Sequence, residues 1–177
     1  MTRRRAADFL LMGSVVLLDQ LTKAFVDRFM SLHESRTLIE GLLHLTYVRN
    51  RGAAFGLFSD AELPFQSALF SVVSLAALGA IAVYFFRLPD ASRLARAALA
   101  LVIGGAVGNL IDRARLGSVI DFVDVFWGLH HWPAFNVADS AISVGVALLV
   151  LDILRAPRGQ RSEKQSLTEV AGAAGRD

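Results

Sequence analysis

Four long apolar segments constrain this chain more than any other feature of its sequence. A helix needs roughly 20 apolar residues to cross a hydrocarbon layer about 30 Å thick. In lipid, backbone N–H and C=O groups must find partners within the protein, so we expect these segments to be helical. The predicted spans are about residues 6–26, 65–86, 94–111 and 137–154.

The composition supports a membrane protein. Hydrophobic residues make up 54% of the 177 residues, which is high for a soluble domain. The chain has no cysteine, which excludes a disulfide, a thiolate metal site and a cysteine nucleophile. "DQLTKAF" follows the first apolar segment where a small-residue cleavage site would be expected, so we predict a retained span rather than a cleaved signal peptide.

The arginines predict how the chain is oriented. They cluster before the first span, in the connection 87–93 and after residue 154, whereas residues 116–136 contain no Lys or Arg. Because cytoplasmic loops carry the excess of Lys and Arg, both termini and the connection 87–93 are predicted to be cytoplasmic. The regions 27–64 and 116–136 then lie on the outer face.

The predicted fold is an all-α membrane protein with four transmembrane helices and a small β-containing region on the outer face. The strand formers in "LLHLTYVRN" and the glycines in "RGAAFG" favour a small sheet within residues 27–64. Residues 1–155 form the predicted membrane domain. Residues 156–177 are polar and aperiodic, and are predicted to be a disordered cytoplasmic tail.

Ionisable residues inside the predicted spans are functional candidates, because a charge at the centre of a spanning helix costs about 2.5 to 3.5 kcal/mol. Asp19 and Lys23 are four residues apart and can pair on one helix face. A structural ion pair and a supporting role at a site are both open interpretations. Asn109, Asp112 and Arg113 follow at spacings of three and four near the outer end of the third span.

Small residues in the third span suggest how it packs. Gly104 and Gly108 form a small-xxx-small pattern, which lets two helices approach closely. We therefore expect a packing role for these two glycines.

Two further stretches bring aspartates to the outer face. In "FNVADS", Asn136 can cap the fourth helix while Asp139 completes a reciprocal cap, and on this stretch alone capping is the simpler role for Asp139. In "VIDFVDVF", an extended chain directs Asp121 and Asp124 to opposite faces, so that one can face a site and the other water.

Among protease chemistries, a carboxylate pair fits these residues best. Two close carboxyl groups hold one proton between them, so the pair can activate water and protonate a leaving amine. No HExxH motif is present, because Thr37 stands where its second histidine would be. None of the histidines falls within a predicted span.

Five motifs resemble those of lipoprotein signal peptidase, the bacterial type II signal peptidase, an aspartyl protease of the inner membrane. They occur in the family's order and cover most of residues 13–155. They are "DQLTK" (19–23), "VRNRGAAFG" (48–56), "GGAVGNLIDR" (104–113), "VIDFVDV" (119–125) and "PAFNVADSA" (133–141).

The resemblance implies that Asp121 and Asp139 are the catalytic pair. It also implies supporting or substrate-binding roles for a further set of positions, namely Asp19, Lys23, Asn50, Gly52, Asn109, Arg113, Asn136 and Ala138. The implied reaction removes the signal peptide from diacylglyceryl-modified prolipoproteins by cleavage before the lipidated cysteine.

The same resemblance sets expectations about partners and location. We expect no metal or organic cofactor, prolipoproteins and membrane lipids as partners, a monomer, and a location in the bacterial inner membrane. The alternatives are a small proton-coupled transporter and a membrane scaffold. A transporter predicts acidic groups spread through the bilayer depth, whereas here Asp19, Asp112 and Asp139 gather toward the outer face, and Asp152 lies near the cytoplasmic end of the fourth span.

Overall fold

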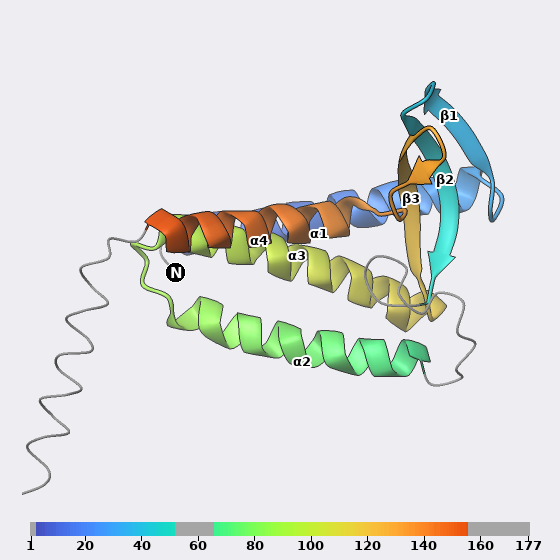
Figure 1. Cartoon of the computed structure of the whole chain (residues 1–177). Helices are drawn as coiled ribbons and strands as arrows, with labels where there is room; N and C mark the ends of the chain where they lie inside the picture. Colours follow the sequence, from blue (N-terminus) through green and yellow to red (C-terminus); the bar gives the residue numbers. More distant parts are fainter. Residues whose placement is uncertain (1–2, 52–65, 156–177) are drawn as a thin grey trace, which may run out of the picture.

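The computed structural model describes residues 3–51 and 66–155, which form four long helices and four short strands (Figure 1). The helices are α1 (Arg3–Phe29), α2 (Gln66–Arg87), α3 (Arg93–Leu116) and α4 (Val137–Arg155). The strands are β1 (Ser35–Ile39), β2 (Leu43–Asn50), β3 (Val119–Trp127) and β4 (His130–His131).

All four helices are long and apolar enough to cross a membrane, which confirms the predicted architecture. The third helix differs from its predicted span, because it continues past Ile111 to Leu116. Asn109 and Asp112 therefore lie within a continuous helix, where they are buried against other polar groups rather than marking a helix end. The predicted tail, residues 156–177, lies outside the described residues.

Helix α3 is the centre of the bundle and contacts α1, α2 and α4. Its glycines allow this close packing. A Cβ at Gly104 would lie 3.0 Å from the carbonyl oxygen of Met12, and a Cβ at Gly108 would collide with the Asp19 carboxylate, both on α1. The predicted packing role of Gly104 and Gly108 is therefore confirmed, and α1 is the partner helix. Gly105 faces α4, where a Cβ would collide with the backbone at Ala138.

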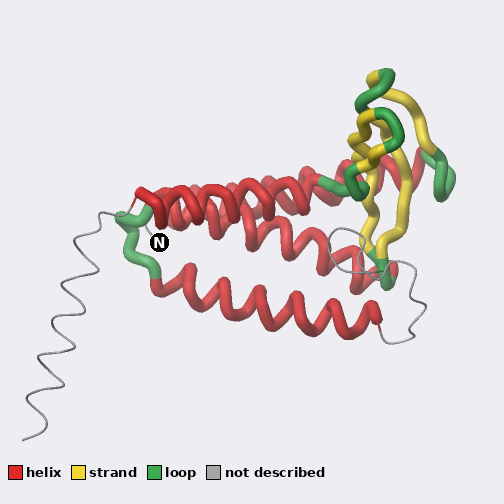
Figure 2. Tube along the Cα trace, in the orientation of Figure 1, coloured by secondary structure: helices red, strands yellow, loops and turns green. Residues whose placement is uncertain are grey.

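The strands form one antiparallel arrangement in the order β1-β2-β3-β4, which lies across one end of the bundle (Figures 1 and 2). Val48 pairs with Asp121 and Asn50 with Val119, and the register shifts between Leu45 and Val48. The predicted small sheet is thus confirmed, with β3 contributed by the segment before α4. The glycines of "RGAAFG" lie outside the described residues.

A small hydrophobic core fixes the sheet to the bundle. Val26 in the last turn of α1 and Met30, which directly follows this helix, pack against Tyr47, Ile120 and Phe122 from β2 and β3. The Tyr47 hydroxyl also donates a hydrogen bond to Asp27 on α1. The sheet is therefore held at a fixed position over the helix ends.

An ion-pair cluster closes the opposite end of the bundle. Arg96 on α3 is buried, donates from Nε to Asp8 on α1 at 2.9 Å, and lies 3.7 Å from Asp90 in the α2–α3 connection. Its guanidinium also lies over the ring of Phe85, 4.7 Å from the centroid. These contacts join three helices at the end remote from the sheet.

Candidate active site

Two asparagines link the carboxyl groups of Asp121 and Asp139. Asn136 donates from Nδ2 to Asp121 Oδ1 at 2.7 Å and to Asn109 Oδ1 at 3.2 Å. Asn109 in turn donates from Nδ2 to Asp139 Oδ1 at 2.8 Å. Asp121 comes from β3, Asn109 from α3 and Asp139 from α4, so three separate elements meet at this point.

Asp139 also takes part in the predicted cap of α4. Its backbone N–H donates to Asn136 Oδ1 at 2.9 Å, and its Oδ2 accepts from the backbone N–H of Asn136 at 3.2 Å. This reciprocal pairing is a capping box. Since Oδ2 serves the cap and Oδ1 faces Asn109, the capping interpretation and a role at the site are compatible for this one side chain.

Lys23 lies behind the asparagines in a buried ionic cluster. Its ammonium group is 2.9 Å from Asp19 Oδ2, 2.9 Å from Asp112 Oδ2 and 2.8 Å from Asn109 Oδ1. An ammonium has three hydrogens to donate, and these three acceptors match them. Asp19 also accepts from the backbone N–H of Ala138 at 2.9 Å. The Asp19–Lys23 pair is thus both a structural ion pair and a direct contact of the site.

Asp112 was noted in the sequence for its position but not included among the site residues. In the structure it is buried, pairs with Lys23, and accepts from the backbone N–H of Ile120 at 3.2 Å. The hydrogen bond from Ile120 holds the backbone of β3 directly beside Asp121. The spacing of three residues from Asn109 was the signal in the sequence that the two share a helix face.

Burial and a neighbouring charge control the protonation of Asp121. Removal from water, followed in importance by the negative charge of Asp139, raises the pKa of Asp121 from 3.8 to about 7. Hydrogen bonds from Asn136 and from Asn50, whose Nδ2 lies 3.0 Å from Asp121 Oδ2, act in the opposite direction. Near neutral pH, Asp121 therefore keeps a proton for much of the time.

The remaining predicted residues have different surroundings. Asn50 ends β2 beside Asp121, and Ala138 is fully buried at the start of α4. The positive charge of Arg113 interacts with Asp139 and Asp121. Gly52 lies outside the described residues.

Asp124 points away from the site, as the alternation along a strand predicted. Its carboxylate is hydrogen-bonded to His131 Nδ1 at 2.9 Å and lies 3.4 Å from His44 Nδ1. The side chain is only 15% exposed, because the two imidazoles cover it. Asp124 therefore does not simply face water, and none of these contacts joins it to Asp121.

These features define a membrane protein with a largely buried polar site at one end of its helical bundle, in which two asparagines link two aspartates. Residues 11–155 match the model of the signal peptidase (SPase) II family, and the chain belongs to that family. Membership makes the chain a protease, as predicted, and does not favour the alternatives of a transporter or a scaffold.

Relatives and solved structures agree with this assignment. The lipoprotein signal peptidase of Geobacter sulfurreducens is 56% identical over 156 residues, covering 87% of this chain and 94% of the relative. That of Geobacillus kaustophilus is 44% identical, covering 77% of this chain and 86% of the relative. A bacterial membrane enzyme solved by the in meso method superposes with a TM-score of 0.75 at 32% identity, covering 85% of this chain and 88% of that one.

Proposed function

We propose that this chain is an aspartic endopeptidase that removes the signal peptide from diacylglyceryl-modified prolipoproteins, cleaving before the lipidated cysteine. The catalytic assignment rests on one observation. A chain of hydrogen bonds, which runs through Asn136 and Asn109, connects Asp121 with Asp139. The names of the relatives support the substrate class. No metal or organic cofactor takes part in the proposed reaction.

The two aspartates have different roles in the proposed mechanism. Asp139 acts as the base and takes a proton from a water that attacks the scissile carbonyl carbon. Asp121 is the acid, since its pKa of about 7 leaves a substantial fraction protonated near neutral pH, and it donates to the carbonyl oxygen. Asp139 then gives its proton to the amine as the C–N bond breaks, and a hydroxyl of the intermediate returns a proton to Asp121.

The other residues of the site support this pair. Lys23, held by Asp19, orients Asn109 by donating to its carbonyl oxygen. Asn136 and the buried Ala138 fix the first turn of α4. We further propose that Asn50, Gly52 and Arg113 position the substrate backbone or the developing oxyanion.

The proposed location is the bacterial inner membrane, with both termini cytoplasmic and the site near the outer face. The sheet and the site lie at one end of the bundle, and the α2–α3 connection, flanked by Arg87 and Arg93, lies at the other (Figure 1). With this orientation, a substrate whose signal helix spans the bilayer presents its cleavage site at the carboxylates. We propose that residues 1–155 act as one peptidase domain, in contact with membrane lipids and as a monomer.

The test is cleavage of a diacylglyceryl-modified prolipoprotein by the purified chain in detergent. We compare the native chain with Asp121→Asn, Asp139→Asn and Asp124→Asn, each checked by thermal unfolding. Asp124→Asn is the matched control, because it alters an aspartate of the same strand that faces the other way. Loss of cleavage in the first two and retention in the third is expected. Near-native cleavage by Asp139→Asn would restrict Asp139 to a helix cap and overturn the assignment.

A further inference from the structure

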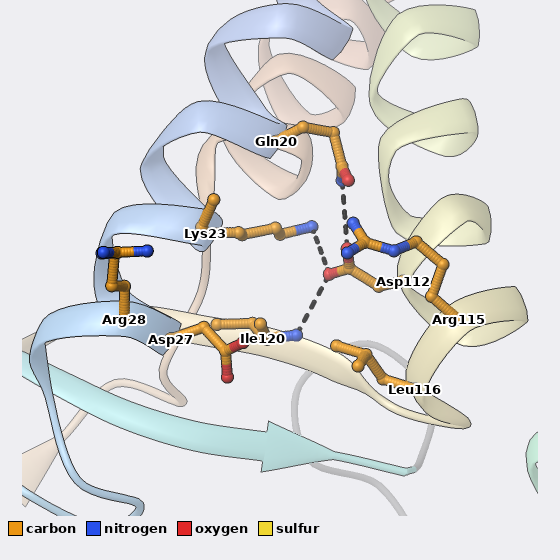
Figure 3. A pocket seen from close by; sticks show the side chains of 9 residues that line it. Gln20, Lys23, Asp27, Arg28, Asp112, Arg115, Leu116 and Ile120 are labelled. Carbon is orange, nitrogen blue, oxygen red and sulfur yellow. Dashed lines mark hydrogen bonds and ion pairs between the residues drawn. The ribbon is translucent and has the colours of Figure 1, made fainter.

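A polar cavity lies apart from the two aspartates, between the last turns of α1 and α3 (Figure 3). Its volume is about 400 Å³, and neither Asp121 nor Asp139 lines it. Gln20 and Lys23 lie on its α1 side, Asp112 on its α3 side, and Ile120 comes from the start of β3. The small side chain of Ala24 leaves the space open.

The carboxylates of this cavity already have partners. Asp112 pairs with Lys23 at 2.9 Å and accepts from Gln20 Nε2 at 3.0 Å. Asp27 accepts from Arg49 at 3.1 Å and from the hydroxyl of Tyr47. Both carboxylates are therefore paired with groups of the protein itself.

The two arginines of the cavity differ from these carboxylates. Arg28 lies in the last turn of α1 and Arg115 in the last turn of α3, and both are exposed. Within residues 3–51 and 66–155, neither guanidinium makes a hydrogen bond or an ion pair, although Asp27 attracts Arg115 over a longer distance. Figure 3 shows them on opposite sides of the cavity.

We propose that this cavity binds the phosphate group of an anionic phospholipid. The cavity lies at the end of two helices that are long and apolar enough to cross a membrane, and the ends of such helices are expected near the lipid head groups. Guanidinium groups match phosphate oxygens in charge and geometry. An anionic lipid is favoured over a zwitterionic one, because Asp27 and Asp112 are already paired and leave no carboxylate for a lipid ammonium group. This proposal goes beyond the proteolytic function and does not rest on it.

The positions of the arginines add an independent argument. Segments on the outer face of a membrane protein are normally poor in Lys and Arg. Arg28 and Arg115 nevertheless lie at the end of the bundle that carries the sheet, opposite the α2–α3 connection. Arg36 and Arg49 at the same end are paired with Glu34 and Asp27. A bound phosphate gives Arg28 and Arg115 a comparable partner.

Native mass spectrometry of the full chain tests the proposal. The chain is released from mixed micelles with equal amounts of phosphatidylglycerol and phosphatidylcholine, and the ratio of the two bound lipids is measured. Arg28→Gln with Arg115→Gln is expected to lower this ratio by up to about 25-fold, from a factor of at most about five for each exposed ion pair between an arginine and the bound phosphate. The matched control is Arg87→Gln with Arg93→Gln, which removes the same charge at the other end of the bundle and is expected to leave the ratio within about twofold.

A second variant tests the cavity itself without changing charge. Ala24→Leu places a larger side chain in the cavity and is expected to lower the ratio of bound phosphatidylglycerol to phosphatidylcholine as well. This variant tests the proposal if the double arginine variant fails to fold. An unchanged ratio in the double arginine variant, or an equal loss in the Arg87/Arg93 control, would overturn the proposal. Loss of bound phosphatidylglycerol on adding millimolar inorganic phosphate would assign the cavity to soluble phosphate and overturn the lipid assignment.

Discussion

Asn136 donates a hydrogen bond to Asp121 at 2.7 Å, and this contact joins the start of α4 to strand β3. The same side chain accepts from the backbone N–H of Asp139 at 2.9 Å and is fully buried. One residue therefore caps the helix that carries Asp139 and holds the carboxyl group of Asp121. The geometry of the proposed catalytic pair depends on a helix cap.

Replacing Asn136 with Ala should reduce both stability and cleavage. Loss of the cap costs about 1 kcal/mol, and the buried polar groups left without a partner cost about 1 to 3 kcal/mol more. Thermal unfolding and prolipoprotein cleavage in detergent measure the two effects. Ser140→Ala is the control, because Ser140 donates only to the backbone carbonyl of Asn136 from an exposed position. Cleavage at the native rate by Asn136→Ala would show that the cap does not position the pair.

The raised pKa of Asp121 predicts how stability depends on pH. The unfolded chain ionises this group near pH 3.8, whereas the folded protein keeps the proton until about pH 7. The stability that Asp121 supplies is therefore fully present below about pH 4 and is lost as the pH rises to about 7.

Asp121→Asn removes this titration, so the variant should gain stability relative to the native chain as the pH rises. The gain is at most about 1.4 kcal/mol per pH unit between about pH 4 and pH 7, with little further change above. Unfolding free energies of both proteins at about pH 5 and about pH 8 measure it. A difference that stays constant between these pH values would contradict the raised pKa.

Gly105 should be intolerant of even one added methyl group. A Cβ there would meet Ile142 Cγ1 at 2.8 Å and the backbone carbonyl of Ala138, one residue before Asp139. Because backbone cannot move aside as a flexible side chain can, Gly105→Ala should cost about 1 to 3 kcal/mol and displace the start of α4.

Gly79→Ala on α2 is the matched control for this prediction, since nothing lies within 4 Å of its added Cβ. It should leave thermal stability and cleavage close to native, whereas Gly105→Ala lowers both. Equal effects of the two substitutions would show that the contact between α3 and α4 does not control the result.

The sequence predicted the helices and the sheet well, because lipid imposes simple rules on length and hydropathy. It located the end of α3 less well. Asn109 and Asp112 look like the end of a span when only their polarity is considered, yet both are satisfied by partners from α1, β3 and α4. Whether a polar residue in a helix is buried or exposed depends on partners distant in sequence.

The same limit applies to the site. The resemblance to the family identified the two aspartates, but spacing alone left Asp139 as a helix cap. Only the fold shows that Asp139 caps the helix with Oδ2 and contacts Asn109 with Oδ1. The role of Asp112 in holding Ile120 was missed, because a backbone N–H on another element has no signature in the sequence.

Lys23 and Arg96 provide a matched pair of buried cations at opposite ends of the bundle. Lys23 is paired with Asp19 and Asp112 beside the site, and Arg96 with Asp8 at the remote end. Lys23→Met leaves the buried carboxylates of Asp19 and Asp112 without this partner, which costs about 3 to 5 kcal/mol. Arg96→Met leaves the carboxylate of Asp8, which is 14% exposed, without its partner and should cost somewhat less. Both variants should therefore unfold at lower temperature.

Only Lys23→Met should impair catalysis by the folded protein, because Lys23 orients Asn109 and through it Asp139. Turnover per folded molecule, measured well below the unfolding temperature of both variants, separates this effect from stability. We expect kcat to fall by at least about tenfold for Lys23→Met, equivalent to about 1.4 kcal/mol of lost transition-state stabilisation, and to stay near native for Arg96→Met. If the two variants lose turnover equally, Lys23 acts on the site only by stabilising the fold.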